Sequence, residues 1–287
     1  MTLPSRDGRA RTFDPDSLSN RNPYLIDWLI PPIGWALTKY FRAEVRGVER
    51  IPKGAALYVG NHNMITYTLD TGIFLAEAYK VHGMDAMPYA LQHDLGVVAP
   101  VLRRLAAFAG GMRASKENAR RVFAAGKKVL TYPGGDLDAC RPFRDRDKIV
   151  FGGRTGYIKL ALRENVPVVP VVAAGAQAVF YILSDMRSLA KMLKLPERFR
   201  ISAWPLTLSM PLGITLGPPP LLIPYPSRIL MEVMEPVRFD RSGPEAAADP
   251  AYVRECADRV ESAMQQTLTL LALERRQRSR RAAVKAS

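Results

Sequence analysis

Histidine and cysteine are scarce in this chain of 287 residues, which has three histidines and two cysteines. The cysteines, Cys140 and Cys256, lack the spacing of a metal site and are too few for a disulfide scaffold. Low-complexity tracts are also missing, and 48% hydrophobic with 24% charged residues is typical of a globular protein. The composition therefore excludes a disulfide-stapled domain, and we expect no metal and no resident cofactor.

An uninterrupted apolar segment that could cross a membrane as a helix is also lacking. The first 22 residues are polar and contain no apolar core of a secretory signal. Residues 24–41, YLIDWLIPPIGWALTKYF, are apolar, but Asp27 and the pair Pro31-Pro32 interrupt them. Their tryptophans and tyrosines are typical of a membrane–water interface, and the alternative is a helical hairpin packed on the domain. We expect a peripheral or monotopic protein at the cytoplasmic face of a membrane.

Acidic residues are outnumbered: 27 Asp and Glu stand against 41 Lys and Arg, for a net charge of +14. Such a balance predicts an anionic partner, which can be nucleic acid, an anionic membrane or a phosphorylated small molecule. No stacking motif or recognition helix accompanies the arginines, so we do not expect nucleic acid. The chain ends in ERRQRSRRAAVKAS, whose basic residues suit either an anionic leaflet or a solvated tail.

Strand-like and helix-like segments alternate through most of the chain, which predicts an α/β fold. We expect a single layered domain with a central mixed, largely parallel sheet flanked by helices, preceded by an amphipathic helical segment. The two prolines in 166–172, VPVVPVV, favour an edge or irregular position for that strand. The predicted strands are 43–47, 55–60, 86–91, 128–132 and 166–172, and the predicted helices are 69–81, 97–108, 115–125 and 154–164.

Two segments near the C-terminus have unusual patterns. Residues 201–227 contain no charge but seven prolines, so we predict a proline-stiffened apolar loop that covers a core or enters a bilayer surface. From residue 249 onward, apolar residues three and four apart predict a final helix. The predicted organisation is a flexible N-terminus (1–22), a membrane-interface segment (23–42), a catalytic domain (43–240) and a C-terminal helix with a basic tail (241–287). The apolar positions of the final helix are Val253, Cys256, Val260, Met264, Leu268 and Leu271.

Four short motifs follow one another in a characteristic order. His62 comes just after the predicted strand 55–60, in YVGNHNMITYTLD, and Asp70 follows eight residues later. A glycine turn carries Arg113, the strand 128–132 runs into Tyr132-Pro133-Gly134-Gly135, and VPVVPVV follows. Over about residues 48–172 this order resembles the glycerolipid acyltransferase superfamily, which includes the 1-acylglycerol-3-phosphate acyltransferases.

The resemblance implies roles for individual residues. His62 and Asp70 correspond to the family's His-x4-Asp motif, here with three extra residues between them. Arg113 corresponds to an arginine that contacts substrate phosphate. The Pro-Gly-Gly sequence departs from the usual Phe-Pro-Glu-Gly and is similar to the diacylglycerol acyltransferase branch, which makes a neutral acylglycerol acceptor plausible beside a lysophospholipid. In that branch an acid often follows the glycines, and Asp138, or alternatively Asp136, takes this place.

Acyl transfer from a thioester to an alcohol requires few groups. His62 would take the hydroxyl proton, Asp70 would orient its imidazole, and the amides of Gly134 and Gly135 would stabilise the oxyanion. The separation of eight residues works only if 63–67 form a loop and Thr68 begins the helix, since eight helical residues rise about 12 Å. The acyl donor would be acyl-CoA or an acyl carrier protein. The candidate substrate-binding residues are Asn61, Arg113, Tyr132, Pro133, Asp136, Asp138 and Arg141.

The sequence leaves several alternatives for the function open. His62 and Asp70 can be structural, which would leave a catalytically degenerate lipid-binding scaffold. A lipid hydrolase is less favoured because no Gly-x-Ser-x-Gly elbow is present. Cys140 is a conceivable nucleophile, although no positioned base is evident for it. We interpret the other two histidines, His82 and His93, as structural.

Overall fold

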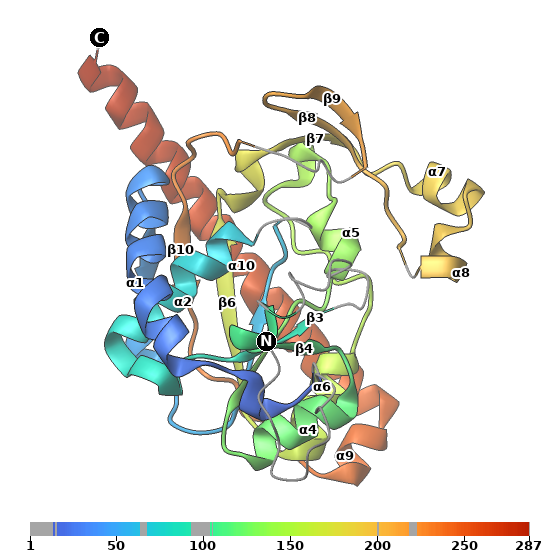
Figure 1. The fold of residues 1–287 in the computed structure, drawn as a ribbon. Helices are drawn as coiled ribbons and strands as arrows, with labels where there is room; N and C mark the ends of the chain where they lie inside the picture. The colour runs from blue at the N-terminus through green and yellow to red at the C-terminus, as the bar shows by residue number, and fades with distance from the viewer. Residues whose placement is uncertain are drawn as a thin grey trace, which may run out of the picture.

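A seven-stranded sheet forms the centre of the computed structural model, which describes residues 14, 16–63, 68–92, 104, 106–199, 201–217 and 223–286 (Figure 1). Neighbouring strands are parallel except for the antiparallel pair β10–β6. This arrangement confirms the predicted α/β fold with a mixed, largely parallel sheet. The strand order is β1 (Glu44–Arg46), β10 (Leu230–Val233), β6 (Val168–Ala174), β2 (Ala56–Gly60), β5 (Lys128–Thr131), β3 (Tyr89–Gln92) and β4 (Gly111–Arg113).

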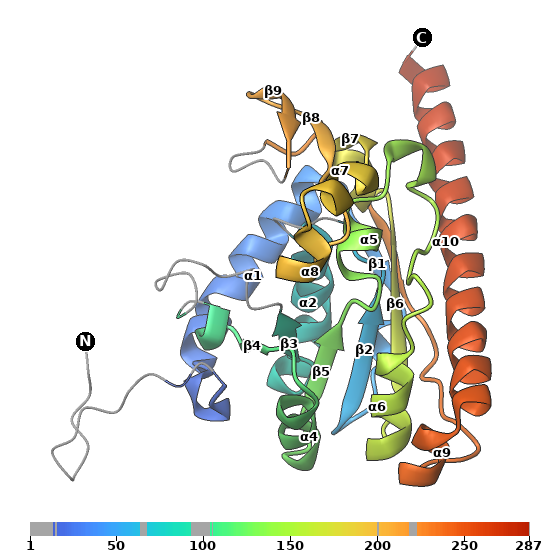
Figure 2. The same cartoon turned by 90° about the vertical axis from the view of Figure 1, so that its right-hand side faces the viewer.

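Helices cover both faces of this sheet, with α1 and α2 on one side and α10 on the other (Figure 2). Side chains alternate along β2, so that Leu57 and Val59 belong to the core beneath α4, α6 and α10, while Tyr58 packs with α2 on the opposite face. The helices are α1 (Pro23–Tyr40), α2 (Leu69–His82), α4 (Lys116–Ala124), α5 (Gly135–Ala139), α6 (Gly156–Glu164), α7 (Arg187–Met192), α8 (Leu195–Phe199), α9 (Pro244–Ala248) and α10 (Pro250–Ala286).

The strand β6 lies in the interior of the sheet, between β10 and β2, so the prediction of an edge or irregular strand is wrong. All seven of its residues are buried. Pro170 lacks only its own N–H, and its carbonyl still accepts a hydrogen bond from the N–H of Met234 at 2.9 Å. The hydrophobic burial of this valine-rich strand outweighs the loss of one backbone donor.

The segment 24–41 forms the single helix α1, which continues through Pro31 and Pro32, so it is neither interrupted nor a hairpin. It packs closely on α2, because a Cβ on Gly34 would lie 2.1 Å from the Cβ of Ala76. The opposite face is open, and Trp28 is 74% exposed. None of the described helices combines the length and the apolar character required to cross a bilayer.

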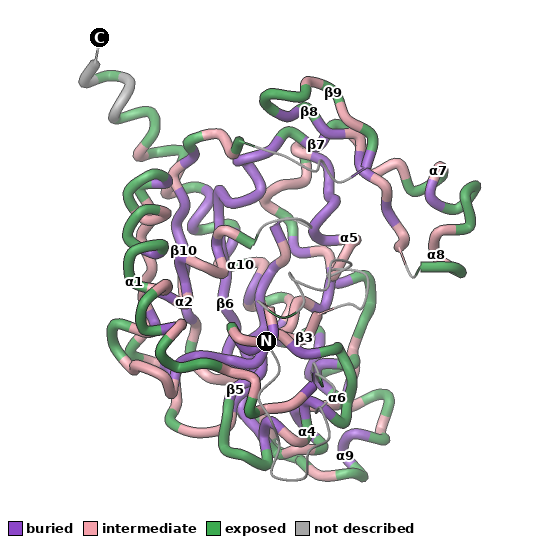
Figure 3. The backbone as a smooth tube through the Cα atoms, in the orientation of Figure 1, coloured by how far each residue is buried: buried purple, intermediate pink, exposed green. Residues whose placement is uncertain are grey.

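The uncharged segment 201–227 contains a β-hairpin, which the prediction of a proline-stiffened loop did not include. Strands β8 (Leu206–Ser209) and β9 (Gly213–Leu216) join β7 (Tyr181–Ser184) in a separate antiparallel sheet at one end of the molecule (Figure 1). Residues 218–222 lie outside the described part of the chain. Figure 3 shows that the central strands consist mostly of buried residues, whereas the hairpin alternates between exposed and more buried residues.

Three further predictions concern chain segments around the sheet. The polar loop predicted for 133–153 contains the short helix α5. Most of the helix predicted for 97–108 lies outside the described residues. Residues 16–22, placed by the sequence in a flexible N-terminus, instead contact the domain: Arg21 donates to the carbonyl of Met87 at 3.0 Å.

The final helix α10 is confirmed, and the six residues chosen from its spacing are all buried against the sheet. The basic tail continues this helix through Ala286. Two of its arginines, Arg276 and Arg278, bind acidic residues of the domain, and Nη1 of Arg278 lies 2.7 Å from Oε2 of Glu44. These arginines are therefore not part of a disordered tail.

Candidate active site

The predicted motifs converge at one edge of the sheet. Strands β2, β5, β3 and β4 run parallel, so their carboxyl ends lie at the same edge. His62 follows β2 by two residues, the turn Tyr132–Gly135 follows β5, and Arg113 ends β4. Ligands of α/β proteins bind outside the carboxyl ends of the strands. This edge is therefore the candidate active site.

The backbone of His62 is held from both sides by two buried side chains. Its N–H donates to Oδ2 of Asp138 at 2.6 Å, and its carbonyl accepts from Nη1 of Arg141 at 2.9 Å. The two side chains also form an ion pair of 2.5 Å and are 0% and 1% exposed. Arg141 and Asp138, which were predicted to bind substrate, are buried and hold the backbone of His62, and substrate binding by them stays a prediction.

The imidazole of His62 is half-buried and stacks on the ring of Tyr132, with centroids 4.6 Å apart and an angle of 22° between the rings. Its Nδ1 is buried and has no hydrogen-bond partner among the described residues. Burial and, to a smaller extent, the charge of Arg141 lower the pKa of His62 while Asp136 opposes them, and the resulting pKa is about 4. The imidazole is therefore neutral at pH 7, which is the state that a general base requires.

Asp70 occupies the first turn of α2, and the helix begins at Leu69 as predicted. Its buried carboxylate accepts from Nδ2 of Asn63 at 2.6 Å and from the N–H of Thr71 at 3.0 Å. Burial raises the pKa of Asp70, while these two hydrogen bonds oppose the rise. No hydrogen bond joins Asp70 to His62 in the described part of the chain, which leaves out 64–67, so their direct contact stays a prediction.

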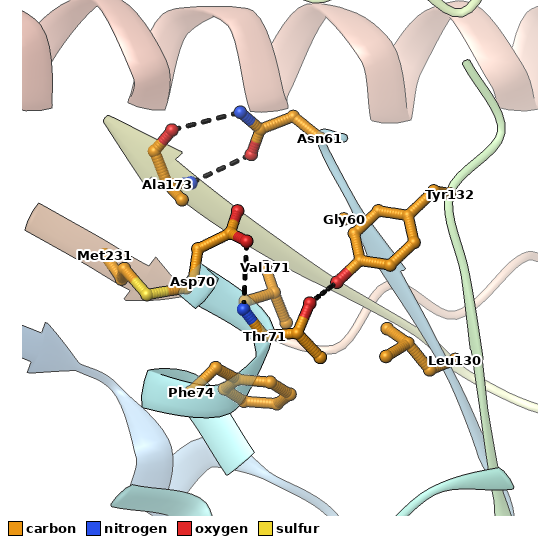
Figure 4. A pocket seen from close by; sticks show the side chains of 10 residues that line it. All are labelled: Gly60, Asn61, Asp70, Thr71, Phe74, Leu130, Tyr132, Val171, Ala173 and Met231. Carbon is orange, nitrogen blue, oxygen red and sulfur yellow. Dashed lines mark hydrogen bonds between the residues drawn. The ribbon is translucent and has the colours of Figure 1, made fainter. Parts of the chain in front are cut away.

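Asp70 also lines a small cavity between the end of β2 and the start of α2 (Figure 4). On the side of β5, the hydroxyl of Tyr132 is hydrogen-bonded to Oγ1 of Thr71. Gly60 makes this placement of the tyrosine possible, because a Cβ there would lie 2.5 Å from its Cε1. The ring that stacks on His62 is thus fixed both by α2 and by a glycine of β2.

The two glycines after β5 form a tight turn. Gly135 has a φ of +50°, a conformation that favours glycine, and a Cβ on Gly134 would lie 2.3 Å from the Cβ of Asp138. The N–H of Gly135 donates to the carbonyl of Tyr132 at 3.0 Å and is thereby used within the turn. The N–H of Gly134 has no hydrogen-bond partner among the described residues, so it is the better candidate for the predicted oxyanion contact.

Three other predicted substrate contacts are engaged within the protein. The side-chain amide of Asn61 donates to the carbonyl of Ala173 at 3.0 Å and accepts from its N–H at 2.8 Å, which extends the β2–β6 pairing. Nη2 of Arg154 donates to Asp136 at 3.0 Å, and its Nη1 donates to the carbonyl of Pro133 at 3.3 Å. Substrate binding by these residues stays a prediction.

Arg113, the predicted phosphate ligand, is paired with Asp16. Its Nε donates to Oδ2 of Asp16 at 2.5 Å, and its backbone N–H donates to Oδ1 at 3.0 Å. Asp16 was not predicted from the sequence, because 97 residues separate the partners. Asn63, which donates to the Asp70 carboxylate, was also not predicted as a site residue, although it directly follows His62.

The alternative nucleophile and bases fit less well. Cys140 is fully buried, and this burial raises the pKa of its thiol. His82 lies at the end of α2, where its Nε2 is 2.8 Å from the carbonyl oxygen of Val48. His93 lies outside the described residues. No three His, Cys, Asp or Glu side chains of the described ranges come together as a metal site would need.

Comparison with known proteins shows the following similarities. Residues 42–174 match the model of the family described as Acyltransferase. An uncharacterized protein of Mycobacterium tuberculosis is 31% identical over 247 residues, which are 86% of this chain, and the chain spans 66% of the length of that relative. A mouse protein named "DGAT1/2-independent enzyme synthesizing storage lipids" is 27% identical over 191 residues, 66% of this chain and 55% of its own length.

Among solved structures, the 1-acyl-sn-glycerophosphate acyltransferase PlsC of Thermotoga maritima has a TM-score of 0.49 and 17% identity over 85% of this chain and 81% of its own. The family match covers the His62 motif, the Arg113 turn, the Gly134-Gly135 turn and β6. The matched segment thus contains every motif whose order indicated the superfamily. Residues 42–174 of the chain thus match the family described as Acyltransferase, and the order of the motifs within them resembles the glycerolipid acyltransferase superfamily.

Proposed function

We propose that this protein transfers a fatty acyl group from a thioester, acyl-CoA or acyl carrier protein, to a hydroxyl of a lysophospholipid or acylglycerol, with His62 as the general base. The observation that carries this proposal is the state of His62. Its imidazole is neutral at pH 7, and its backbone is held by the buried pair Asp138–Arg141 at the carboxyl edge of a parallel sheet.

The proposed reaction needs only one proton carrier. His62 removes the proton of the acceptor hydroxyl as its oxygen attacks the thioester carbonyl. The resulting tetrahedral oxyanion is stabilised by amide donors, for which the Gly134 N–H is the candidate. The intermediate then collapses, the C–S bond breaks, and the imidazolium returns the proton to the thiolate. The products are an ester and a thiol, so the proton balance closes.

Two observations support the proposed acceptor class. The Pro-Gly-Gly turn is similar to the diacylglycerol acyltransferase branch, and a relative is named for the synthesis of storage lipids. Both support acylglycerols as acceptors in addition to lysophospholipids. The basic residues around the site suit the phosphates of coenzyme A, although Lys128 is not available because it is buried and paired with Asp85 at 2.8 Å.

A transfer assay tests the proposal. The purified protein would be incubated in mixed micelles with labelled acyl-CoA, or in parallel with labelled acyl carrier protein, and a panel of lysophospholipids and acylglycerols. We expect a labelled ester of at least one acceptor. Free fatty acid without ester would instead indicate a lipid hydrolase. The lack of both products with either donor would contradict the proposal and favour a lipid-binding scaffold, the alternative that the longer His62–Asp70 spacing leaves open.

We further propose that the protein works at an anionic membrane surface through the outer face of α1 and the β8–β9 hairpin. Trp35 of α1 is 63% exposed and Ile214 of the hairpin is 67% exposed. The hydroxyl of Tyr40, at the end of α1, donates to the carbonyl of Pro224 at 2.7 Å, which joins α1 to the segment after the hairpin. Aromatic side chains favour the membrane interface. The helix α1 ends in the upper part of the molecule, where the β8–β9 hairpin also lies (Figure 2).

Replacing Ile214 and Leu216 together by serine is expected to weaken binding to anionic vesicles about tenfold, because two exposed apolar side chains would no longer enter the interface. Flotation with vesicles of phosphatidylcholine and phosphatidylglycerol measures the bound fraction. The control is Val81→Ser, which changes an exposed valine at the end of α2. Equal flotation of the double variant and the control would show that the hairpin is not a membrane contact.

A further inference from the structure

The backbone of Arg113 lies at the same carboxyl edge of the sheet as the proposed base, His62. In the sheet register, Tyr58 pairs with Leu130, Leu130 with Ala90, and Ala90 with Gly111. Two residues further along each strand, Arg113 is therefore level with Gly60, which precedes His62 by two residues. Three strand spacings of about 4.8 Å separate the two positions, or roughly 14 Å across the sheet. Arg113 is thus located to meet the far end of an acceptor whose hydroxyl lies near His62.

Asp16 already occupies this guanidinium. Both Nε and Nη2 of Arg113 contact Oδ2 of Asp16, and the backbone N–H of Arg113 donates to Oδ1. The side chain of Arg113 is 61% exposed, whereas that of Asp16 is only 7% exposed. The positive charge facing solvent is therefore compensated from beneath by a carboxylate.

The position of Asp16 is determined by the fold. Nη1 of Arg121 on α4 donates to its carbonyl at 3.3 Å. Arg21, a few residues later, lies 3.7 Å above the ring of Tyr89 and donates to the carbonyl of Met87. Burial raises the pKa of Asp16, but the hydrogen bonds from Arg113 outweigh this effect and lower it, so the carboxylate is ionised at neutral pH.

We propose that Asp16 is a specificity-determining residue, which neutralises Arg113 and so directs the site toward acceptors without a phosphate group. A phosphate that approached Arg113 would lie beside a fixed negative charge and would have to displace a hydrogen-bonded carboxylate. A neutral acylglycerol meets no such repulsion. This inference rests on the proposed function and deepens it, since it selects the acylglycerol from the two acceptor classes.

The test compares 1-acylglycerol with 1-acylglycerol 3-phosphate of the same acyl chain, using labelled acyl-CoA as donor. For the wild type we expect a higher kcat/KM with the neutral acceptor. Asp16→Asn, which is nearly isosteric, is expected to lower the neutral-to-phosphate ratio at least about fivefold by raising kcat/KM for the phosphate acceptor. The matched control is Glu117→Gln, which removes a carboxylate from an exposed arginine pair on α4 and leaves the ratio unchanged.

A binding measurement separates this inference from the proposed function. The affinity for each acceptor in detergent micelles would be measured without any donor. We expect Asp16→Asn to bind the phosphate acceptor at least about fivefold more tightly and the neutral acceptor as before. An unchanged ratio of affinities, or a wild type that prefers the phosphate acceptor, would overturn the inference even in a protein without transferase activity. If the affinities shift as expected but no acyl transfer occurs, only the proposed function is overturned.

Discussion

Replacing His62 by alanine is expected to lower the rate of acyl transfer at least about 100-fold, the usual contribution of a positioned general base. The fold should persist, because Asp138 and Arg141 hold the backbone of His62, and alanine keeps both of these backbone groups. The variant loses the imidazole and its stacking on Tyr132. Initial rates with the best acceptor of the wild type measure the effect.

The matched control is His82→Ala, since His82 lies at the far end of α2 and contacts the carbonyl of Val48. This variant should retain transfer. The pH profile of the wild type gives a second readout: with the pKa of His62 lowered to about 4, the base stays neutral and kcat/KM stays level as the pH falls below 6.5. Activity is lost only as the pH approaches 4. Full activity of the alanine variant would contradict His62 as the base, and a midpoint near 6.5 would contradict the lowered pKa of His62.

The sequence predicts those parts of the fold that depend on local patterns. In α10 the spacing of apolar residues identified six positions, and each is buried, because a helix of fixed period can present only one face to the sheet. The placement of His62 has the same basis. A buried strand that ends at Gly60 brings the following residues to the carboxyl edge whatever the remainder of the chain does.

Features that depend on distant parts of the chain were predicted poorly. The prolines of α1 argue against a continuous helix, but the close packing of Gly34 on Ala76 compensates for their local cost. The sequence pattern does not predict the β8–β9 hairpin. Its exposed apolar residues obscure the alternation of apolar and polar residues that usually marks a strand. The pairing of Asp16 with Arg113 is a contact between separate segments, which neither residue indicates by itself.

The second large effect is expected from Asp138→Asn, which should lower the free energy of unfolding by about 3–5 kcal/mol. The substitution removes the direct ion-pair partner of the Arg141 guanidinium, which is only 1% exposed. Oδ1 of Asp138 also accepts from the N–H of Val150 at 3.1 Å, so the loop after α5 loses order as well. Urea denaturation of the wild type and the variant measures the difference.

Asp145→Asn is the control, because it removes a carboxylate from the same loop. Asp145 pairs with Lys148 at 2.6 Å, and the lysine side chain is 67% exposed. Solvent screens such a pair, so its loss should change the free energy of unfolding by less than about 1 kcal/mol. Similar losses in the two variants would show that the buried pair has no special role in stability.

The double variant Asp138→Asn, Arg141→Gln separates stability from the positioning of His62. In the double variant no unpaired Arg141 guanidinium remains buried, so much of the lost stability should return. The His62 N–H then no longer donates to a carboxylate and the His62 carbonyl no longer accepts from a guanidinium, so kcat should stay low while KM changes little. Recovery of both stability and kcat would show that the pair only stabilises the loop. Recovery of stability alone would establish that this buried ion pair, 76 and 79 residues beyond His62 in sequence, holds the base in its catalytic position.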